Sequence, residues 1–214
     1  MTAGPLLPNV LAFAVAYALT QGIKGSNLFR TVFFMPNLIG GIVLGYVWSM
    51  IFDGILSRYG TSILLETKYG FWGLIILMCW QQVGYMMIIY IAGLQAVPED
   101  MLEAAKIDGA NRWQQIVHVT LPSLLPTIIT LTLMSIGKIF YSDFGLFYQV
   151  PMDSGPLLDI TSTIDTYVYR ALITLNDYGR SSAAGVYQSV VGFILVLCAN
   201  LAVKKIGGEE NALF

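Results

Sequence analysis

Long apolar stretches alternate with shorter polar ones along the whole chain. The five longest apolar runs cover residues 5–20, 31–52, 71–97, 123–141 and 186–203. A helix of roughly 20 apolar residues is long enough to cross a bilayer, and a helix satisfies all of its backbone hydrogen bonds within itself. The pattern therefore predicts an all-α membrane protein, a polytopic bundle of five transmembrane helices that forms one domain over residues 1–214.

The first run, residues 5–20, is the shortest and has a second interpretation as a cleaved signal peptide. A signal peptide begins with basic residues and ends at a pattern of small residues. No basic residue precedes this run, and no such pattern closes it before Lys24. We therefore favour a membrane span.

The second run carries two local signals. Pro36, followed by Asn37, predicts a kink at the entry, because proline lacks a backbone donor and clashes with the preceding turn. Gly41 and Gly45 form a GxxxG pair, which allows a neighbouring helix to approach closely. Packing alone explains the pair, so it predicts no dimer.

Composition supports a membrane protein and excludes several functions. Hydrophobic residues make up 56% of the chain and charged residues 11%, with a mean hydropathy of +0.69. The net charge of −2 points to no particular partner and gives no sign of nucleic-acid binding. Cys79 and Cys198 lie in apolar runs, so we expect no disulfide and no metal site. A single histidine, His118, and the absence of G-x-x-x-x-G-K-[ST] predict no metal centre and no ATP site in this chain.

The polar stretch 98–122 lies between two runs that can each cross a membrane. Pro98 suits a first helical position, and Glu99 and Asp100 lie at the positive end of the helix dipole. Gly109 predicts a break by a residue that adopts positive φ. A second short helix follows, with its apolar residues at helical spacing and Leu121 and Pro122 at its end. Two helices bent at a glycine predict a compact knob for a socket on a partner, and the alternative is a solvated connector.

Polar residues inside or beside the spans indicate a candidate substrate pathway, since polar groups in hydrocarbon are costly unless they meet partners or line a wet cavity. Aromatic rings beside amides also suit sugars. The candidates are Trp80, Gln81, Gln82, Tyr85, Lys138 and Tyr141. The alternatives are hydrogen bonding between helices for the glutamines and a Lys138 side chain that reaches the membrane interface.

Residues 142–185 form the longest region outside the predicted spans. They are rich in aspartate and aromatic residues, and the positions of Tyr167, Val168, Ala171 and Leu172 predict an amphipathic helix. Packing against other helices is the commoner meaning of such a helix. Contact with a protein that delivers the substrate is a second interpretation.

Basic residues beside the spans predict the orientation. The side that holds loops 21–30 and 98–122 and the carboxyl end has six of them, Lys24, Arg30, Lys106, Arg112, Lys204 and Lys205. The opposite loops have four, Arg58, Lys68, Arg170 and Arg180. The positive-inside rule therefore places loop 98–122 in the cytoplasm and the loop 142–185 outside.

Loop 98–122 also carries a signature that resembles a known family. Glu103, Ala104 and Ala105, then Gly109, then Val119, Leu121 and Pro122 reproduce the EAA-x3-G-x9-I-x-LP loop of ABC importer permeases, with Val119 in place of isoleucine. The segments FRTVFFMPN, SDFGLFYQVP and IDTYVYRAL resemble the carbohydrate-uptake branch, closest to oligosaccharide and aldouronate-type permeases. The resemblance covers nearly all of residues 5–206.

The resemblance implies a type I importer permease that forms the pathway for a sugar or oligosaccharide in a bacterial cell membrane. It implies docking of a separate ATPase on Glu103, Ala104, Ala105, Asp108, Gly109, Val119, Leu121 and Pro122, with Glu103 pairing a basic residue. ATP and Mg²⁺ would bind that ATPase, so this chain needs no cofactor and is no enzyme. A second permease, forming a heterodimer, and an external solute-binding protein complete the implied assembly.

Two further expectations concern the chain as a whole. Related permeases usually begin with another span, which this sequence lacks, either because Met1 is an internal start or because the chain works without that helix. A self-contained ion-coupled transporter is the alternative function, but it should place acidic residues inside its spans. None of the thirteen acidic residues falls within a predicted run. A membrane scaffold without transport is the third interpretation.

Overall fold

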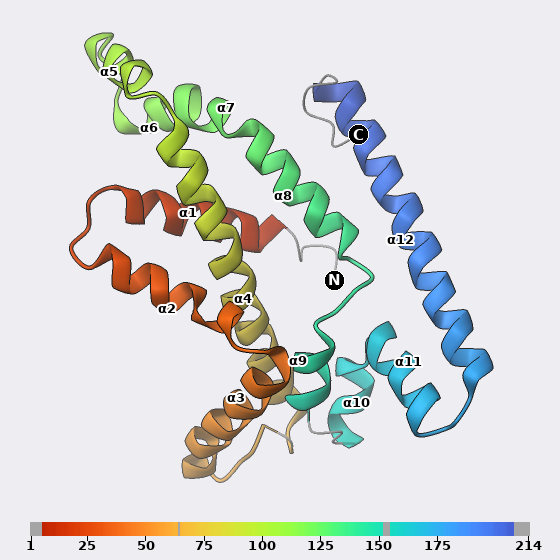
Figure 1. The fold of residues 1–214 in the computed structure, drawn as a ribbon. Coiled ribbons are helices and arrows are strands. Elements are labelled where there is room, and N and C mark those ends of the chain that lie inside the picture. The colour runs from red at the N-terminus through yellow and green to blue at the C-terminus, as the bar shows by residue number, and fades with distance from the viewer. Residues whose placement is uncertain (1–5, 64, 152–154, 208–214) are drawn as a thin grey trace. The chain divides into compact units, whose positions relative to one another are not determined.

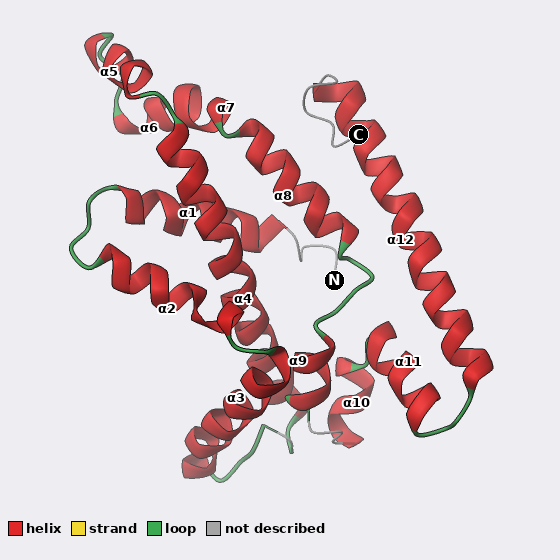
Figure 2. Ribbon diagram, in the orientation of Figure 1, coloured by secondary structure: helices red, strands yellow, loops and turns green. Residues whose placement is uncertain are grey.

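Helices form all the regular structure in the computed structural model, which describes residues 6–63, 65–151 and 155–207, and no strand occurs among those residues (Figure 1; Figure 2). The all-α prediction is thereby confirmed. In chain order the elements are α1 Leu6–Thr20, α2 Ser26–Leu38, α3 Gly41–Leu56, η1 Ser57–Tyr59, α4 Thr67–Ala96, α5 Glu99–Ile107, α6 Arg112–Gln115, η2 Ile116–Thr120, α7 Leu121–Ser123, α8 Leu125–Gly137, α9 Phe144–Gln149, α10 Gly155–Thr161, α11 Ile164–Ile173 and α12 Tyr178–Gly207.

Within the part of the chain that the structure describes, two helices are long and apolar enough to cross a membrane by themselves, namely α4 and α12. Two bent helix pairs add two more spans only if each pair counts as a single span. The first pair is α2 with the α3–η1 segment, bent by 112°, and the second is the helix that ends at Ser123 with α8, bent by 65°. The helix over Leu7–Thr20 is apolar but shorter. The predicted count of five spans is therefore not confirmed.

The bends explain the difference from the hydropathy pattern. Residues 31–52 were expected as one helix, but helix α2 ends at Leu38 and α3 begins at Gly41. Pro36, which is buried, lies inside α2, so the predicted kink is present but falls just after the proline rather than at it. Run 123–141 likewise breaks at Leu124 and its helix ends at Gly137. Hydropathy reports only that a segment is apolar, and an apolar segment that turns gives the same signal.

The described chain divides into two compact units. Among the described residues, the first comprises 6–34, 82–136 and 198–207, and the second comprises 35–63, 65–81, 137–151 and 155–197. Since α2, α4, α8 and α12 each contribute residues to both, the boundaries fall inside helices. The interpretation of residues 1–214 as one domain stays a prediction.

The core of the first unit joins α1, the second half of α4 and α8. Its small residues Ala12 and Ala16 are fully buried, which lets α1 lie close to the larger side chains of Met87 and Tyr90. The Tyr90 hydroxyl donates to Oδ1 of Asn9 at 3.0 Å, so the two polar groups satisfy each other. The end of α4, from which loop 98–122 starts, is thus firmly packed.

The core of the second unit depends on the close approach of α3 and α9. A Cβ on Gly41 would lie 2.5 Å from Oδ1 of Asp143, and one on Gly45 would lie 3.1 Å from Cβ of Gln149. A Cβ on Gly145 would lie 2.6 Å from the backbone nitrogen of Ile42. The prediction that the GxxxG pair admits a close neighbour is confirmed, and the neighbour is α9.

Residues 142–185 contain three short helices, α9, α10 and α11. The predicted amphipathic helix is confirmed as α11, in which Thr166 and Ala171 are buried and Tyr167 is exposed. Oδ2 of Asp165 accepts hydrogen bonds from the backbone N–H (2.6 Å) and hydroxyl (2.7 Å) of Ser142, and Oδ1 accepts one from Gln188 (3.0 Å). Burial raises the pKa of Asp165, but these hydrogen bonds outweigh it and hold the pKa below its ordinary value.

Candidate functional site

The candidate site is the α5–α7 segment, called here the knob and comprising residues 98–123. Helix α5 begins at Glu99, with Pro98 as its extended N-cap and Glu99 and Asp100 in its first turn. The predicted start is therefore right to within one residue, because Pro98 precedes the first helical position instead of occupying it. Two carboxylates at this end match the positive pole of the helix dipole.

The end of α5 is a Schellman motif built on Gly109. This glycine has φ +81°, and its N–H donates to the Lys106 carbonyl at 3.1 Å while the Ala110 N–H donates to Ala105 at 2.9 Å. Both bonds satisfy carbonyls that a helix end leaves open. The prediction that Gly109 breaks the helix with positive φ is confirmed.

The second helix of the knob starts at a capping box. Asn111 Oδ1 accepts from the Gln114 N–H at 2.9 Å, and Gln114 Oε1 accepts from the Asn111 N–H at 2.8 Å. Helix α6 then widens into the π-helical turn η2 and continues as α7 through Ser123. The predicted second helix is confirmed, and its end is right to within one residue, because the helix that contains Leu121 and Pro122 stops at Ser123.

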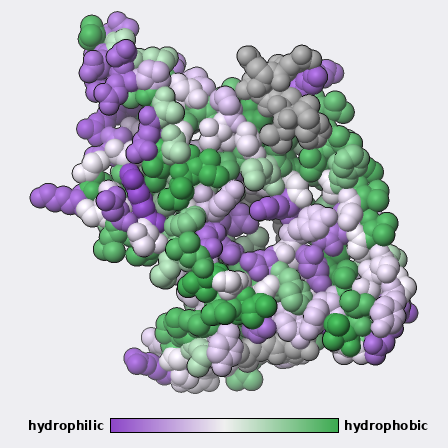
Figure 3. Space-filling model, in the orientation of Figure 1, coloured by the Kyte–Doolittle hydropathy of each residue, from purple (hydrophilic) through white to green (hydrophobic). Residues whose placement is uncertain are grey.

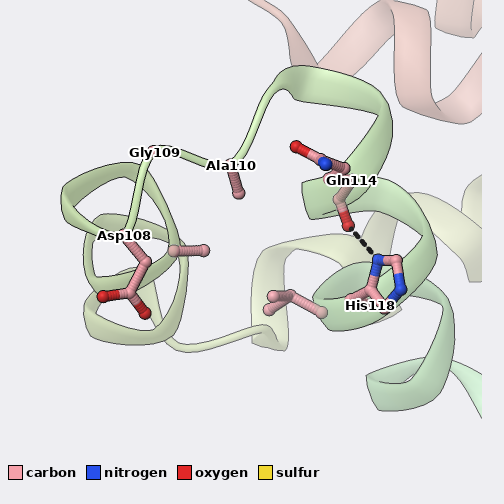
Figure 4. Close-up of a pocket in the computed structure, with 7 residues that line it drawn as sticks. Asp108, Gly109, Ala110, Gln114 and His118 are labelled. Atoms are coloured by element: carbon pink, nitrogen blue, oxygen red, sulfur yellow. Dashed lines mark hydrogen bonds between the residues drawn. The ribbon is translucent and has the colours of Figure 1, made fainter.

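A cavity of about 290 Å³ lies in the angle between α5 and the second helix. Figure 4 shows Asp108, Gly109 and Ala110 on one side and Gln114 and His118 on the other. Nδ1 of His118 lies 3.0 Å from the Gln114 backbone oxygen. The His118 side chain is exposed, as expected for a solvated helix.

The residues predicted for docking are divided between the cavity and the outer surface. Ala105, Asp108, Gly109 and Val119 line the cavity. The other four lie outside it, with Glu103, Ala104 and Pro122 exposed and Leu121 half-buried.

Several large, exposed apolar side chains on the knob were not among the docking predictions. The three most exposed are Ile107 at 86%, Trp113 at 70% and Met101 at 49%, and Val117 is 36% exposed. Figure 3 shows hydrophilic residues gathered over α5, so these side chains lie on an otherwise polar surface. Large apolar residues in a polar loop were a sequence signal for a contact surface, and the N-x-x-Q spacing of Asn111 and Gln114 was a signal for the capping box.

The candidate pathway residues are shared between the two units. In the second unit the Trp80 ring lies 5.9 Å from that of Trp48, Gln81 Nε2 donates to Asp143 Oδ2 at 3.3 Å, and the Gln81 carbonyl accepts from Asn37 at 3.0 Å. Both residues therefore hold helices together, which matches the alternative interpretation for Gln81.

The remaining four candidates differ in exposure. Lys138 is exposed and follows directly on the last residue of α8. Tyr141 is half-exposed and its hydroxyl lies 3.5 Å from Oγ of Ser189. In the first unit Gln82 is half-buried and Tyr85 is 38% exposed. None of the six candidates lines the cavity in the knob.

One acidic residue lies within a helix that was expected to end before it. Helix α3 extends to Leu56 and so includes Asp53, whose Oδ1 accepts from the Ser62 hydroxyl and the Ile63 N–H, each at 2.8 Å. Asp53 lies directly after run 31–52, so no acidic residue falls within that run, but the helix continues for a turn beyond the apolar residues and includes Asp53. Its carboxylate ties the next loop to α3.

No cluster of three or more potential metal ligands occurs among the residues that the structure describes. Cys79 is half-buried, Cys198 is exposed, and both are free thiols.

Known proteins resemble this chain in sequence. Residues 9–206 match the family described as binding-protein-dependent transport system inner membrane component. A probable starch degradation products transport system permease protein of Thermoanaerobacterium thermosulfurigenes is 33% identical over 88% of this chain and 65% of its own length. An arabinooligosaccharides transport system permease protein of Bacillus subtilis (strain 168) is 30% identical over 95% of this chain and 66% of its own length. The chain therefore spans just under two thirds of these relatives.

Solved structures share the fold. A chain from a bacterial ABC transporter involved in the import of the acidic polysaccharide alginate matches with a TM-score of 0.82 and 23% identity, over 94% of this chain and 77% of that one. A second, from a bacterial alginate ABC transporter in complex with an alginate pentasaccharide-bound periplasmic protein, has a TM-score of 0.77 and 24% identity, over 96% and 73%. The signature loop, the helical fold and the family match over residues 9–206 together show that this chain belongs to the binding-protein-dependent transport system inner membrane components.

Proposed function

We propose that this chain is a permease subunit of an ATP-binding-cassette importer and forms part of the pathway for a sugar or oligosaccharide. The observation that carries the proposal is the knob, a bent pair of helices. A Schellman motif ends the first helix, and a capping box begins the second. Its sequence has the importer signature, and its bend, which local hydrogen bonds hold, supports a role in docking. The family match over residues 9–206 supports the same conclusion.

The exposed side chains of the knob, together with its cavity, are the proposed contact for the ATPase. They combine the exposed carboxylates of Glu103 and Asp108 with the exposed apolar side chains of Ile107 and Trp113. Apolar anchors surrounded by charges are typical of protein interfaces, in which the anchors supply affinity and the charges supply specificity. Glu103 is the residue proposed to pair with an arginine or lysine of the ATPase.

The energy for transport is proposed to come from that separate subunit, which would bind ATP and Mg²⁺. In this proposal the chain catalyses no reaction. Its helices line the pathway and change position during transport. A second, similar permease would complete the membrane part as a heterodimer, and an external binding protein would deliver the cargo. The family description, binding-protein-dependent transport system inner membrane component, and the solved transporter in complex with a periplasmic protein support the binding-protein part of this assembly.

The cargo is proposed to be a carbohydrate because the printed names of the relatives refer to starch degradation products and arabinooligosaccharides. Tyr85, Lys138 and Tyr141 have exposed surface that a sugar could contact. Trp80 and Gln81 contact neighbouring helices, so we propose that they position the helices that line the pathway and do not contact the sugar themselves. Gln82 is the sixth candidate for the pathway.

The orientation proposed for this bacterial cell-membrane protein has the knob in the cytoplasm and residues 142–185 outside. An ion-coupled carrier is a weaker candidate, because the carboxylate of Asp53 accepts two hydrogen bonds from the following loop. Such a carboxylate is committed to local structure.

The test is to reconstitute the full chain with the ATPase, second permease and binding protein expressed from neighbouring genes. We expect ATP-dependent uptake of an oligosaccharide and loss of ATPase co-purification in Glu103→Lys. Asp159→Lys is the matched control, since Asp159 is an exposed acidic residue outside the knob. Wild-type co-purification of the Glu103→Lys variant, or equal loss in both variants, would overturn the proposed docking role.

A further inference from the structure

A second, larger cavity of about 660 Å³ lies against α5, and neither Glu103 nor Ile107 lines it. Glu99, Leu102 and Lys106 line it at positions i, i+3 and i+7, which form a single stripe of a helix. Its other walls are the carboxyl ends of α1 and α4, together with α6 and η2. All of these residues belong to the first unit.

Two cationic side chains line the cavity. Lys106 and Arg112 both line it with exposed side chains, and within the described residues neither side chain makes a hydrogen bond or an ion pair. Glu99 is the one acidic residue in its lining, so the cavity has a formal charge of +1. Gln21 and Gln95 add amide groups that can donate hydrogen bonds.

The cavity also lies where two apolar helices end. Tyr17 and Thr20 line it from the last turn of α1, and Leu94 lines it from the last turn of α4. On α1, Val10 and Ala14 precede Tyr17 by seven and three residues, so they lie on the same stripe of the helix. Both side chains are exposed, Val10 to 65%. A polar, cationic cavity thus continues into an exposed apolar stripe.

We propose that this cavity binds the phosphate headgroup of an anionic phospholipid, with Lys106 and Arg112 contacting the phosphate and an acyl chain lying along Val10 and Ala14. Arginine and lysine are the usual phosphate ligands, and basic pockets between membrane helices recognise anionic headgroups. The volume falls within the range of small-ligand sites. Phosphate monoesters in solution share the headgroup chemistry, but they would gain nothing from the apolar stripe.

The site differs in position and chemistry from the proposed ATPase contact. Lipid would occupy the stripe of α5 that contains Leu102 and Lys106, leaving Glu103 and Ile107 free for a protein. A lipid at this site would hold α5 against the ends of α1 and α4. Its occupancy does not require transport, so the inference stands or falls independently of the proposed function.

The experiment measures binding of fluorescent phosphatidylglycerol to the full purified chain in neutral detergent, with or without co-purifying subunits. Unlabelled phosphatidylglycerol, phosphatidylcholine and glycerol 1-phosphate serve as competitors. We expect competition by unlabelled phosphatidylglycerol and at least tenfold weaker competition by the other two. Lys106→Gln and Arg112→Gln should each weaken binding about fivefold, because a basic residue near an anionic lipid surface contributes an effect of that size.

Two further variants keep the test sharp. Glu99→Gln should strengthen binding several-fold, since it removes the negative charge from the cavity while preserving the shape of the side chain. Lys24→Gln is the matched control, because Lys24 is an exposed cation of the same unit outside the cavity. Equal loss in Lys24→Gln, no gain in Glu99→Gln, or equal competition by phosphatidylcholine would overturn the proposal. If glycerol 1-phosphate competed as effectively as unlabelled phosphatidylglycerol, the ligand of the cavity would be a soluble phosphate. That result would also overturn the proposal.

Discussion

Replacing Gly109 tests whether the bend of the knob depends on backbone conformation alone. The residue has φ +81°, which lies in the left-handed region. Glycine adopts this region freely, asparagine adopts it at times, and most other residues avoid it. A Cβ built there meets no atom within 4 Å, so no steric contact contributes to the effect. The left-handed conformation costs about 1–2 kcal/mol for an ordinary residue and more for a β-branched one.

That cost is small against the several kcal/mol by which proteins are stable, so the variants should still fold. It is large for the local equilibrium between the bent and the unbent knob, which 1–2 kcal/mol shifts by roughly five- to thirtyfold. We therefore expect Gly109→Asn to remain close to wild type, Gly109→Ala to lose affinity for the ATPase about fivefold, and Gly109→Val to lose more. ATP hydrolysis should become uncoupled from uptake in the same order.

The assay is co-purification with the ATPase, followed by uptake and hydrolysis in reconstituted vesicles. Gly54→Val is the matched control, because Gly54 also has open space around its Cβ position but does not have positive φ. Equal affinity and uptake for the asparagine and valine variants would refute the conformational reasoning. So would a loss in Gly54→Val as large as that in Gly109→Val.

Three other predictions follow from the structure. Ile107→Ala should weaken ATPase binding by about 2 kcal/mol, or roughly thirtyfold, if the side chain fills a socket, and isothermal titration would contradict this by giving an unchanged Kd. Gly145→Ala should destabilise the fold by about 1–3 kcal/mol, because its Cβ would lie 2.6 Å from backbone that no rotamer change can move; an unchanged melting temperature in detergent would refute the close packing. Asp165 has a lowered pKa when folded, so its carboxylate stabilises the fold above its unfolded pKa of about 3.9 and loses that effect as the pH falls through the folded value. Asp165→Asn should lower the melting temperature at pH 7 and remove this acid-sensitive part, and a variant with the wild-type pH profile of stability would count against the assignment.

Local chemistry determined how well the knob could be predicted from the sequence. The start of α5 and the break at Gly109 depend on residues adjacent in the chain, and both were right to within one residue. The Asn111 and Gln114 capping box is equally local and readable, but it was overlooked. Assignment of the knob to a transporter came from the signature spacing and not from physical reasoning.

Features that depend on distant residues were beyond the sequence. The hydrogen bond between Gln81 and Asp143 joins positions 62 apart in the chain, so the amide pair gave no sign of its partner. The 112° bend after α2 interrupts a continuous apolar run, and hydropathy is blind to direction. The glycine pair at Gly41 predicted a close neighbour, whereas its identity as α9 required the structure.

The hydrogen bonds around Gly109 and Asn111 make the tip of the knob stiff. A stiff tip has little conformational freedom to lose when it is clamped, so most of the contact energy would remain as affinity. A stiff tip would also move as one rigid body. A displacement of its outer end would therefore be transmitted to the last turn of α4 and would not be lost by bending within the knob. The two short helices would then act as a lever arm whose rigidity is set by the backbone and side-chain hydrogen bonds at its turn.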